Sequence, residues 1–197
     1  MQEEPLSGND SLLIIQNMIN KVKNQFSEDG FMYLLWGWVI LTCSVGQFVL
    51  LKLDYKYHYM IWLLTWGAFI FQLFYLRKLS RKRRVQTYTD DILKYVWISF
   101  VLIMCLTSFV LGRTLGVDYF RVLNPLILII YGIPTFLSGI ILRFRPLVIG
   151  GIACWLLSIA ATFAHYEYQV LLLGVAVIAA WIIPGFLLRG RYKKQNA

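Results

Sequence analysis

Charged residues are scarce in this chain of 197 residues. Asp, Glu, Lys and Arg make up 15% of it, and hydrophobic residues make up 59%. Soluble proteins contain roughly 25% charged and about 45–50% apolar residues. A soluble fold of this size has too little interior to bury so much apolar surface. We therefore expect a lipid bilayer to be the solvent.

The sequence has little that could support cysteine or metal chemistry. Its cysteines, Cys43, Cys105 and Cys154, lie in long apolar runs without CxxC or Cys/His spacing, which favours small packing residues over disulfides or zinc. The two histidines, His58 and His165, map to one interface without a carboxylate cluster or a third histidine. They are interpreted as interfacial anchors, with haem or metal ligation as the alternative. We expect no metal and no cofactor.

Ionisable residues are nearly absent from the middle of the apolar runs. Lys94, Arg113 and Arg121 lie near the ends of runs, where long side chains can reach the headgroups. Because ionisable groups at bilayer depth usually mark pumps and membrane enzymes, their absence argues against a proton-coupled pump, an intramembrane protease and a metal-dependent hydrolase. We predict a protein that is not an enzyme and has no catalytic residues.

Six long apolar runs predict an all-α polytopic membrane protein. Each is close to the roughly 20 residues that a helix needs to cross about 30 Å of hydrocarbon. The predicted spans are 31–51, 59–76, 92–112, 122–142, 147–164 and 169–188. They form a six-helix transmembrane domain at 31–188, between an N-terminal segment at 1–30 and a basic tail at 189–197. Small residues at 150–151, 160, 164, 176 and 180 predict a close approach of the fifth and sixth helices.

Residues 11–26 predict an amphipathic helix ahead of the first span. Leu12, Ile15, Ile19, Val22 and Phe26 repeat at steps of 3, 4, 3 and 4, which is helical spacing. Such a helix would lie in the headgroup layer or against the cytoplasmic face of the bundle. The alternative is a docking helix for a partner or a self-association seam.

The positive charges predict the orientation of the chain, whose net charge is +9. Six crossings place both termini on one side of the membrane. Fourteen of the nineteen Lys and Arg residues fall on that side, and four fall on the other. Short loops rich in Lys and Arg stay in the cytoplasm. We therefore expect both termini to be cytoplasmic.

The loop between the second and third spans begins with the stretch RKLSRKRR. Its cations are Arg77, Lys78, Arg81, Lys82, Arg83 and Arg84. They lie directly below the membrane, where each basic residue contributes roughly 1 kcal/mol of attraction to anionic headgroups. No folded domain or interleaved aromatic residue surrounds them, so nucleic acid is not an expected partner.

Prolines interrupt the fourth and sixth spans. Pro134 follows Tyr131 by three residues, and Pro184 follows Trp181 by three. Proline frees a backbone carbonyl and kinks a helix, and paired broken helices can mark the site of a transporter. These four residues are the candidates for a solute path, although such prolines are also ordinary in membrane bundles.

Three stretches resemble a group of uncharacterised bacterial six-span integral membrane proteins with a YLLWGW-type first span. They are FMYLLWGWVI, NPLILIIYGIPTFLSGIILRFRPLVIGGIACW and IIPGFLLRGRYKK. The resemblance covers about residues 12 to 194. It implies a multi-pass protein of the bacterial cytoplasmic (inner) membrane and supplies no catalytic residues.

Two functional hypotheses follow. The first is a non-enzymatic integral membrane protein that associates at its cytoplasmic rim through residues 11–26, 77–84 and 189–194. Its target would be anionic membrane lipids, a second copy of the chain or a protein partner. The alternative is a transporter or channel for a small neutral or lipophilic solute, with its site between the fourth and sixth spans.

Overall fold

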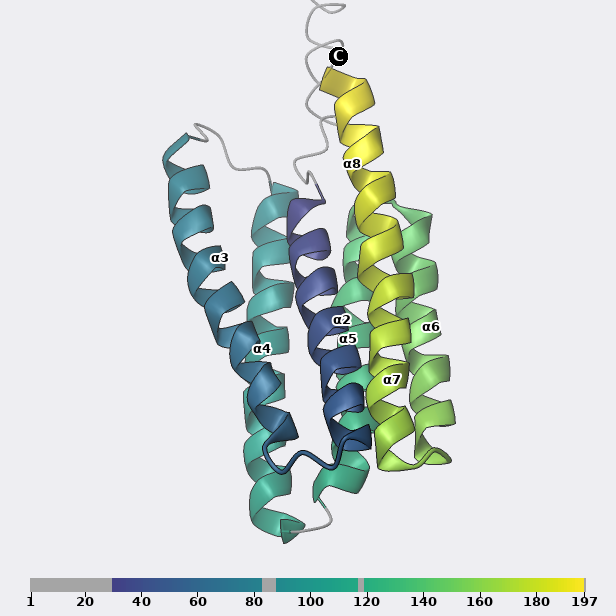
Figure 1. The fold of residues 1–197 in the computed structure, drawn as a ribbon. Helices are drawn as coiled ribbons and strands as arrows, with labels where there is room; N and C mark the ends of the chain where they lie inside the picture. Colours follow the sequence, from purple (N-terminus) through teal and green to yellow (C-terminus); the bar gives the residue numbers. More distant parts are fainter. Residues whose placement is uncertain (1–29, 83–87, 117–118, 197) are drawn as a thin grey trace, which may run out of the picture.

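The computed structural model describes residues 30–82, 88–116 and 119–196 of the chain (Figure 1). Within these ranges every regular element is helical and there is no strand. The elements are α2 (Phe31–Lys52), η1 (His58–Trp62), α3 (Leu63–Lys82), α4 (Tyr88–Thr114), α5 (Tyr119–Ile141), α6 (Arg145–Thr162), α7 (Tyr166–Val177), η3 (Ile178–Ile182) and α8 (Ile183–Asn196). The predicted amphipathic helix at 11–26 lies outside the described residues.

In the part of the chain that the structure describes, six helices are long and apolar enough to cross a membrane, which confirms the predicted fold class. They cover Phe31–Lys52, His58–Lys78, Asp91–Thr114, Tyr119–Ile141, Arg145–Thr162 and Tyr166–Lys194. The last helix is longer than the predicted span 169–188. It begins at Tyr166, and α8 carries it through the basic tail as far as Asn196, because no proline or glycine in the tail interrupts the helix after Gly190.

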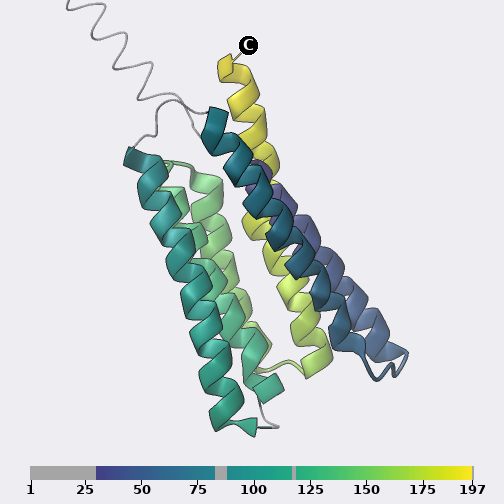
Figure 2. The same ribbon diagram turned by 90° about the vertical axis from the view of Figure 1, so that its left-hand side faces the viewer.

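The helices form two layers that share one core. Figure 2 shows α4, α5 and α6 in one layer, and α2, α3 and the continuous α7–α8 helix in the other. The helices α5 and α6 pack along their length, α2 packs against α7, and α4 packs against α5. Fully buried side chains such as Leu128, Leu147 and Leu173 lie between the layers.

The helices α3 and α4 lie at the edge of the bundle. Among the described elements, α3 contacts α2 and η1, and α4 contacts α5. Both helices expose large apolar side chains, of which Trp66 in α3 is 66% exposed and Phe109 in α4 is 70% exposed. Lipid tails are as apolar as these side chains, so a bilayer can cover them without cost.

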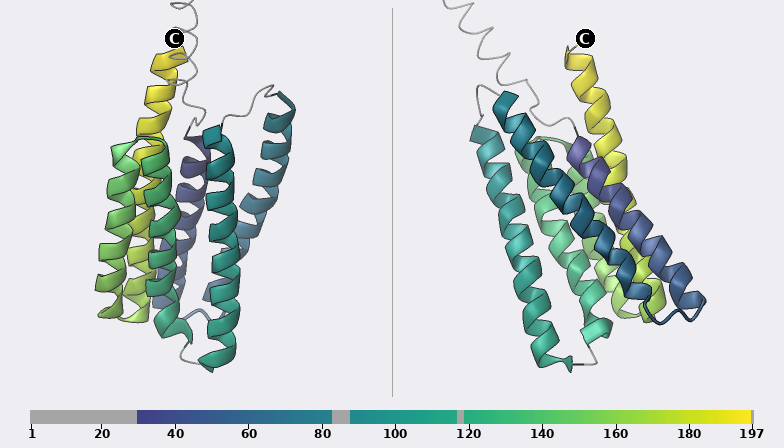
Figure 3. Two further views of the ribbon diagram at one scale, coloured as in Figure 1. Left: turned by 180° about the vertical axis from the view of Figure 1, so that it is seen from behind. Right: turned by 60° about the vertical axis from the view of Figure 1, so that its left-hand side comes forward.

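The first and last described residues, Gly30 and Asn196, lie at the same end of the bundle, because six helices run between them. The start of α2, the end of α3, the start of α4, the α5–α6 turn and the end of α8 all lie there (Figures 1 and 3). We call this the basic end. The connections after α2, α4 and α6 lie at the opposite end.

The fifth and sixth spans approach each other closely at a glycine, which confirms that prediction. Gly150 of α6 lies against the backbone of η3, where a Cβ atom on Gly150 would be 2.6 Å from the Cα atom of Ala180. The segment Ile178–Ile182 is a π-helix, and Pro184 follows it in α8. A wide helical turn ahead of a proline accommodates its ring and its missing N–H group.

Candidate functional site

The structure describes part of the basic 77–84 stretch. Arg77 and Lys78 are exposed near the end of α3. Arg81 and Lys82 complete the helix, but their side chains lie outside the description, and residues 83–84 lie outside the described ranges altogether. The first four cations are therefore on a helix that extends past the apolar part of the span, which ends at Lys78.

The α5–α6 turn places two further cations at the basic end. Arg143 and Arg145 are both exposed. The amide of Arg143 donates to the carbonyl of Ile140 over 3.0 Å, and the amide of Phe144 donates to the carbonyl of Gly139 over 2.8 Å. These bonds end α5 with Arg143 in the left-handed region, at a φ of 50°. Glycine usually occupies such a position at the end of a helix.

The third group of cations lies on α8. Arg189, Arg191, Lys193 and Lys194 are exposed on the last turns of this helix, which rises above the other helices in Figure 1. Together with the previous two groups they make eight exposed cations at the basic end that come from α3, the α5–α6 turn and α8. These residues come from three separate parts of the chain, and the fold brings them to one end.

The opposite end has fewer cations, and one of them is paired. Lys52 forms an ion pair with Glu167, which links the end of α2 to the start of α7. Lys56, Arg113 and Arg121 are exposed there. Among the described residues, the exposed cations are thus more numerous at the basic end than at the opposite end, as the sequence predicts.

The four solute-path candidates are all buried, and two of them, Tyr131 and Trp181, meet in the interior. The rings of Tyr131 and Trp181 stack with centroids 4.8 Å apart, and the indole Nε1 of Trp181 donates to Thr135 Oγ1 over 2.9 Å. Tyr131 and Trp181 are buried, and Pro134 and Pro184 are fully buried. The structure brings Tyr131 and Trp181 together, and the sequence gave no indication of Thr135 as a partner of Trp181.

Two aromatic rings of α4 extend this cluster. Trp97 meets Trp181 edge-on with centroids 6.0 Å apart, and Phe100 lies 5.5 Å from Tyr131. Their spacing of three residues on one apolar helix was the available signal. The rings fill the contact between α4, α5 and η3, so this arrangement is suited to holding helices together.

A buried amide organises the opposite end of the bundle. Gln47 Oε1 accepts from Trp62 Nε1 over 2.6 Å, and Gln47 Nε2 donates to the hydroxyl of Tyr166 over 3.0 Å. The same Nε2 lies 3.2 Å from His58 Nδ1. These bonds join α2, η1 and α7. Because every polar atom of Gln47 has a partner, its burial carries no unsatisfied group.

The structure places the two histidines in different surroundings. His58 lies half-buried beside Gln47 in η1, whereas His165 is exposed directly before α7. Among the residues that the structure describes, no group of three or more His, Cys, Asp or Glu side chains could hold a metal ion.

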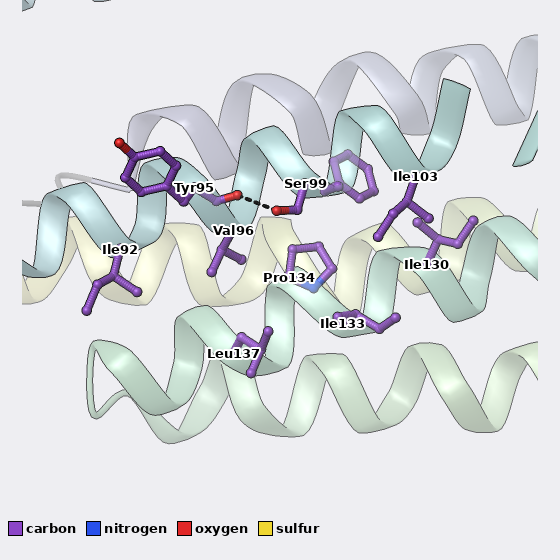
Figure 4. Close-up of a pocket in the computed structure, with 10 residues that line it drawn as sticks. Ile92, Tyr95, Val96, Ser99, Ile103, Ile130, Ile133, Pro134 and Leu137 are labelled. Carbon is purple, nitrogen blue, oxygen red and sulfur yellow. Dashed lines mark hydrogen bonds between the residues drawn. The ribbon is translucent and has the colours of Figure 1, made fainter. Parts of the chain in front are cut away.

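A groove separates part of α4 from α5 (Figure 4). It has a volume of about 310 Å³, and its walls are almost entirely apolar. The lining residues are Ile92, Tyr95, Val96, Ser99, Phe100, Ile103, Ile130, Ile133, Pro134 and Leu137. Pro134 is the one solute-path candidate among them. Tyr131 and Trp181 lie on the interior side of α5 and are not part of the lining.

No family model, curated protein or solved structure matches this chain. The resemblance to bacterial six-span membrane proteins therefore stays a prediction, and the function is argued from the chain itself.

Proposed function

We propose that this chain is a non-enzymatic integral membrane protein that associates with anionic lipid headgroups at its basic end. In this proposal the basic end faces the cytoplasm of a bacterial cell, with the chain in the cytoplasmic membrane. The supporting observation is the collection of eight exposed cations from α3, the α5–α6 turn and α8 at one end of the bundle.

The distribution of these cations favours a charged plane over a single partner. They lie on α3 at one side of the bundle and on the α5–α6 turn and α8 at the other side (Figures 1 and 3). Each cation near an anionic membrane surface contributes about 1 kcal/mol of attraction. At the opposite end the attraction is weaker, because Glu167 pairs with Lys52 and Asp54 adds an exposed negative charge.

The orientation in this proposal rests on the same cations. Short loops with excess Lys and Arg are retained on the cytoplasmic side during insertion, and the described connections between spans are short. One charge distribution would therefore set the topology and then hold anionic lipids in the cytoplasmic leaflet. Self-association and binding of a protein partner are the other two hypotheses. The contacts among the described residues give no reason to prefer either of them to lipid binding.

The packing inside the bundle does not favour the transporter alternative. A solute path between the fourth and sixth spans would need space beside Tyr131 and Trp181, whereas these rings stack on each other and are buried. A tightly packed contact of this kind stabilises a helix pair. We therefore keep association with lipid as the proposed function.

The proposal can be tested with the full chain in nanodiscs that contain spin-labelled lipids. We expect motionally restricted lipid at the protein surface to be enriched in phosphatidylglycerol over phosphatidylcholine, and the enrichment to fall at high salt because exposed charges are screened. The K193Q/K194Q variant should lower the enrichment.

The matched control is K56Q/R113Q, which removes two exposed cations from the opposite end. This variant should retain most of the enrichment in phosphatidylglycerol. Equal enrichment of both lipids around the wild-type chain, or an equal loss in the two variants, would contradict the proposal.

A further inference from the structure

We propose that the groove between α4 and α5 binds one acyl chain of an anionic phospholipid from the leaflet at the basic end, with the headgroup beside Arg143 and Arg145. The acyl-chain part of this proposal depends on the groove alone. The headgroup part rests on the proposed function, because it uses the cations of the basic end.

The length and depth of the groove match one leaflet. On α4 the lining runs from Ile92 to Ile103, which is about 16 Å along a helix. Half of a bilayer core of about 30 Å is about 15 Å. Ile92 lies next to the start of the span at Asp91, so the groove occupies the half of the membrane at the basic end.

The groove is open on the side where lipid lies. Tyr95, Ile103, Ile133 and Leu137 form its rim, with exposed fractions from 39% to 65%. Pro134 and Ile130 are buried at its base. Figure 4 shows the side chains of Val96 and Pro134 directed toward each other across the groove. An acyl chain could enter sideways from the bilayer without leaving hydrocarbon.

The walls contain almost no group that a polar ligand could use. The hydroxyl of Ser99 donates to the carbonyl of Tyr95 over 2.8 Å, within the same helix (Figure 4). Pro134 has no N–H group to offer. The other lining side chains, apart from the Tyr95 hydroxyl, are hydrocarbon. A polar solute would lose its hydration in this groove without gaining hydrogen bonds, so the lining selects an apolar occupant.

The size of the groove excludes a helix as its occupant. A helix with its side chains is about 10–12 Å across, and the space of about 310 Å³ lies at the small end of the range of about 300–1,000 Å³ for small-molecule sites. A flexible alkyl chain fits a narrow apolar space and is already present beside it at high concentration.

The end of the groove near the headgroups has polar and positive groups. Figure 4 shows the Tyr95 side chain directed away from Ile103, toward the end at which α4 begins. Seen from behind, α4 and α5 lie side by side, and the α5–α6 turn lies at the same end as the start of α4 (Figure 3). This places Arg143 and Arg145 at the level where a lipid phosphate would lie.

The experiment uses the full chain in nanodiscs with a phosphatidylglycerol that carries a diazirine near the middle of one acyl chain, which is the part that would lie beside Val96, Ile133 and Leu137. After irradiation, peptide mapping should show more label at Val96, Ile133 and Leu137 than at Ile98 and Val101. The last two are on the other side of α4 and are 45% and 43% exposed. Labelling that simply follows exposure would overturn the proposal.

A pair of matched variants tests whether the groove itself holds the chain. I133W fills the groove and should abolish the label at Val96 and Leu137. I129W introduces the same ring on α5 at a position that is 41% exposed, against 40% for Ile133, but does not line the groove. This control should keep the label, and loss of the label in both variants would contradict the assignment.

The headgroup is tested with the same diazirine on phosphatidylcholine. The wild-type chain should show less label in the groove with this lipid, and R143Q/R145Q should remove the difference between the two lipids. Equal labelling by both lipids in the wild type would overturn the headgroup assignment. If K193Q/K194Q shows no effect on lipid enrichment while the groove label persists, the proposed function fails and the acyl-chain site stands.

Discussion

Substitution of Gly150 by alanine should separate two helices that touch through their backbones. A Cβ atom at this position would lie 2.6 Å from Ala180 Cα and 2.9 Å from the carbonyl oxygen of Ala179. Both atoms belong to the backbone of η3, so no side chain can rotate out of the way. Reaching a separation of 3.4 Å, the start of ordinary contact, requires α6 and η3 to move apart by about 0.8 Å.

The expected loss of stability follows from two opposing effects. Overpacking of a close contact costs roughly 1–3 kcal/mol. Alanine is a better helix former than glycine by about 0.8–1.0 kcal/mol, which offsets part of that loss. We expect a net loss of up to about 2 kcal/mol in the free energy of unfolding. For a chain of this length that corresponds to an apparent Tm lower by up to about 8 °C.

The assay is the loss of the monodisperse size-exclusion peak after heating in detergent. G67A is the matched control, because a Cβ atom at Gly67 of α3 meets nothing within 4 Å. It gains the helix propensity without the clash, so its apparent Tm should be unchanged or higher. A G150A variant that melts at or above the wild-type temperature would show that α6 and η3 are not in contact at this position.

Three further predictions concern the ends of the bundle. Q47L leaves the indole N–H of Trp62 without its acceptor and the Tyr166 hydroxyl without its donor. It should lower stability by about 1–3 kcal/mol, measured by the same heating assay; an unchanged Tm would contradict the network. E167Q removes the partner of Lys52 in an exposed ion pair and should change stability by less than about 1 kcal/mol, so a larger fall in Tm would show that the pair is shielded from water. In a background without native cysteines, a membrane-impermeant thiol reagent should label Y57C in intact cells and K193C only after permeabilisation; the reverse pattern would invert the proposed topology.

The six spans could be predicted because the signal for each is contained in one continuous segment. A run of about 20 apolar residues has few stable forms in a bilayer other than a helix, so no knowledge of the neighbouring segments was needed. The sixth helix shows where this reasoning stops. Hydropathy falls at Arg189, but helical hydrogen bonding continues to Asn196, because water can solvate charged side chains on a helix that leaves the membrane.

The candidate site could be predicted only in part, from residues whose type and position in the sequence are unusual in themselves. Tyr131 and Trp181 are large aromatic residues three positions before prolines, and they do meet. The sequence could not show that Trp97 and Phe100 complete the cluster, because that depends on the rotation of α4 against α5. The groove was not predictable for the same reason. The groove exists because α4 and α5 do not pack tightly against each other along part of their length. The sequence of each helix is that of an ordinary transmembrane span.

The exposed position of α3 connects the fold to the proposed association with lipid. A bond of 2.7 Å from Trp36 Nε1 to Gln72 Oε1 joins α2 to this helix. Between helices in hydrocarbon there is no hydrophobic driving force, so van der Waals packing and such hydrogen bonds determine how firmly α3 is held. Arg77 and Lys78 extend from its end at the basic rim. Anionic headgroups that bind these cations would act on the least firmly packed helix of the bundle, so the lipid composition of one leaflet can influence the position of α3 more than that of the core helices.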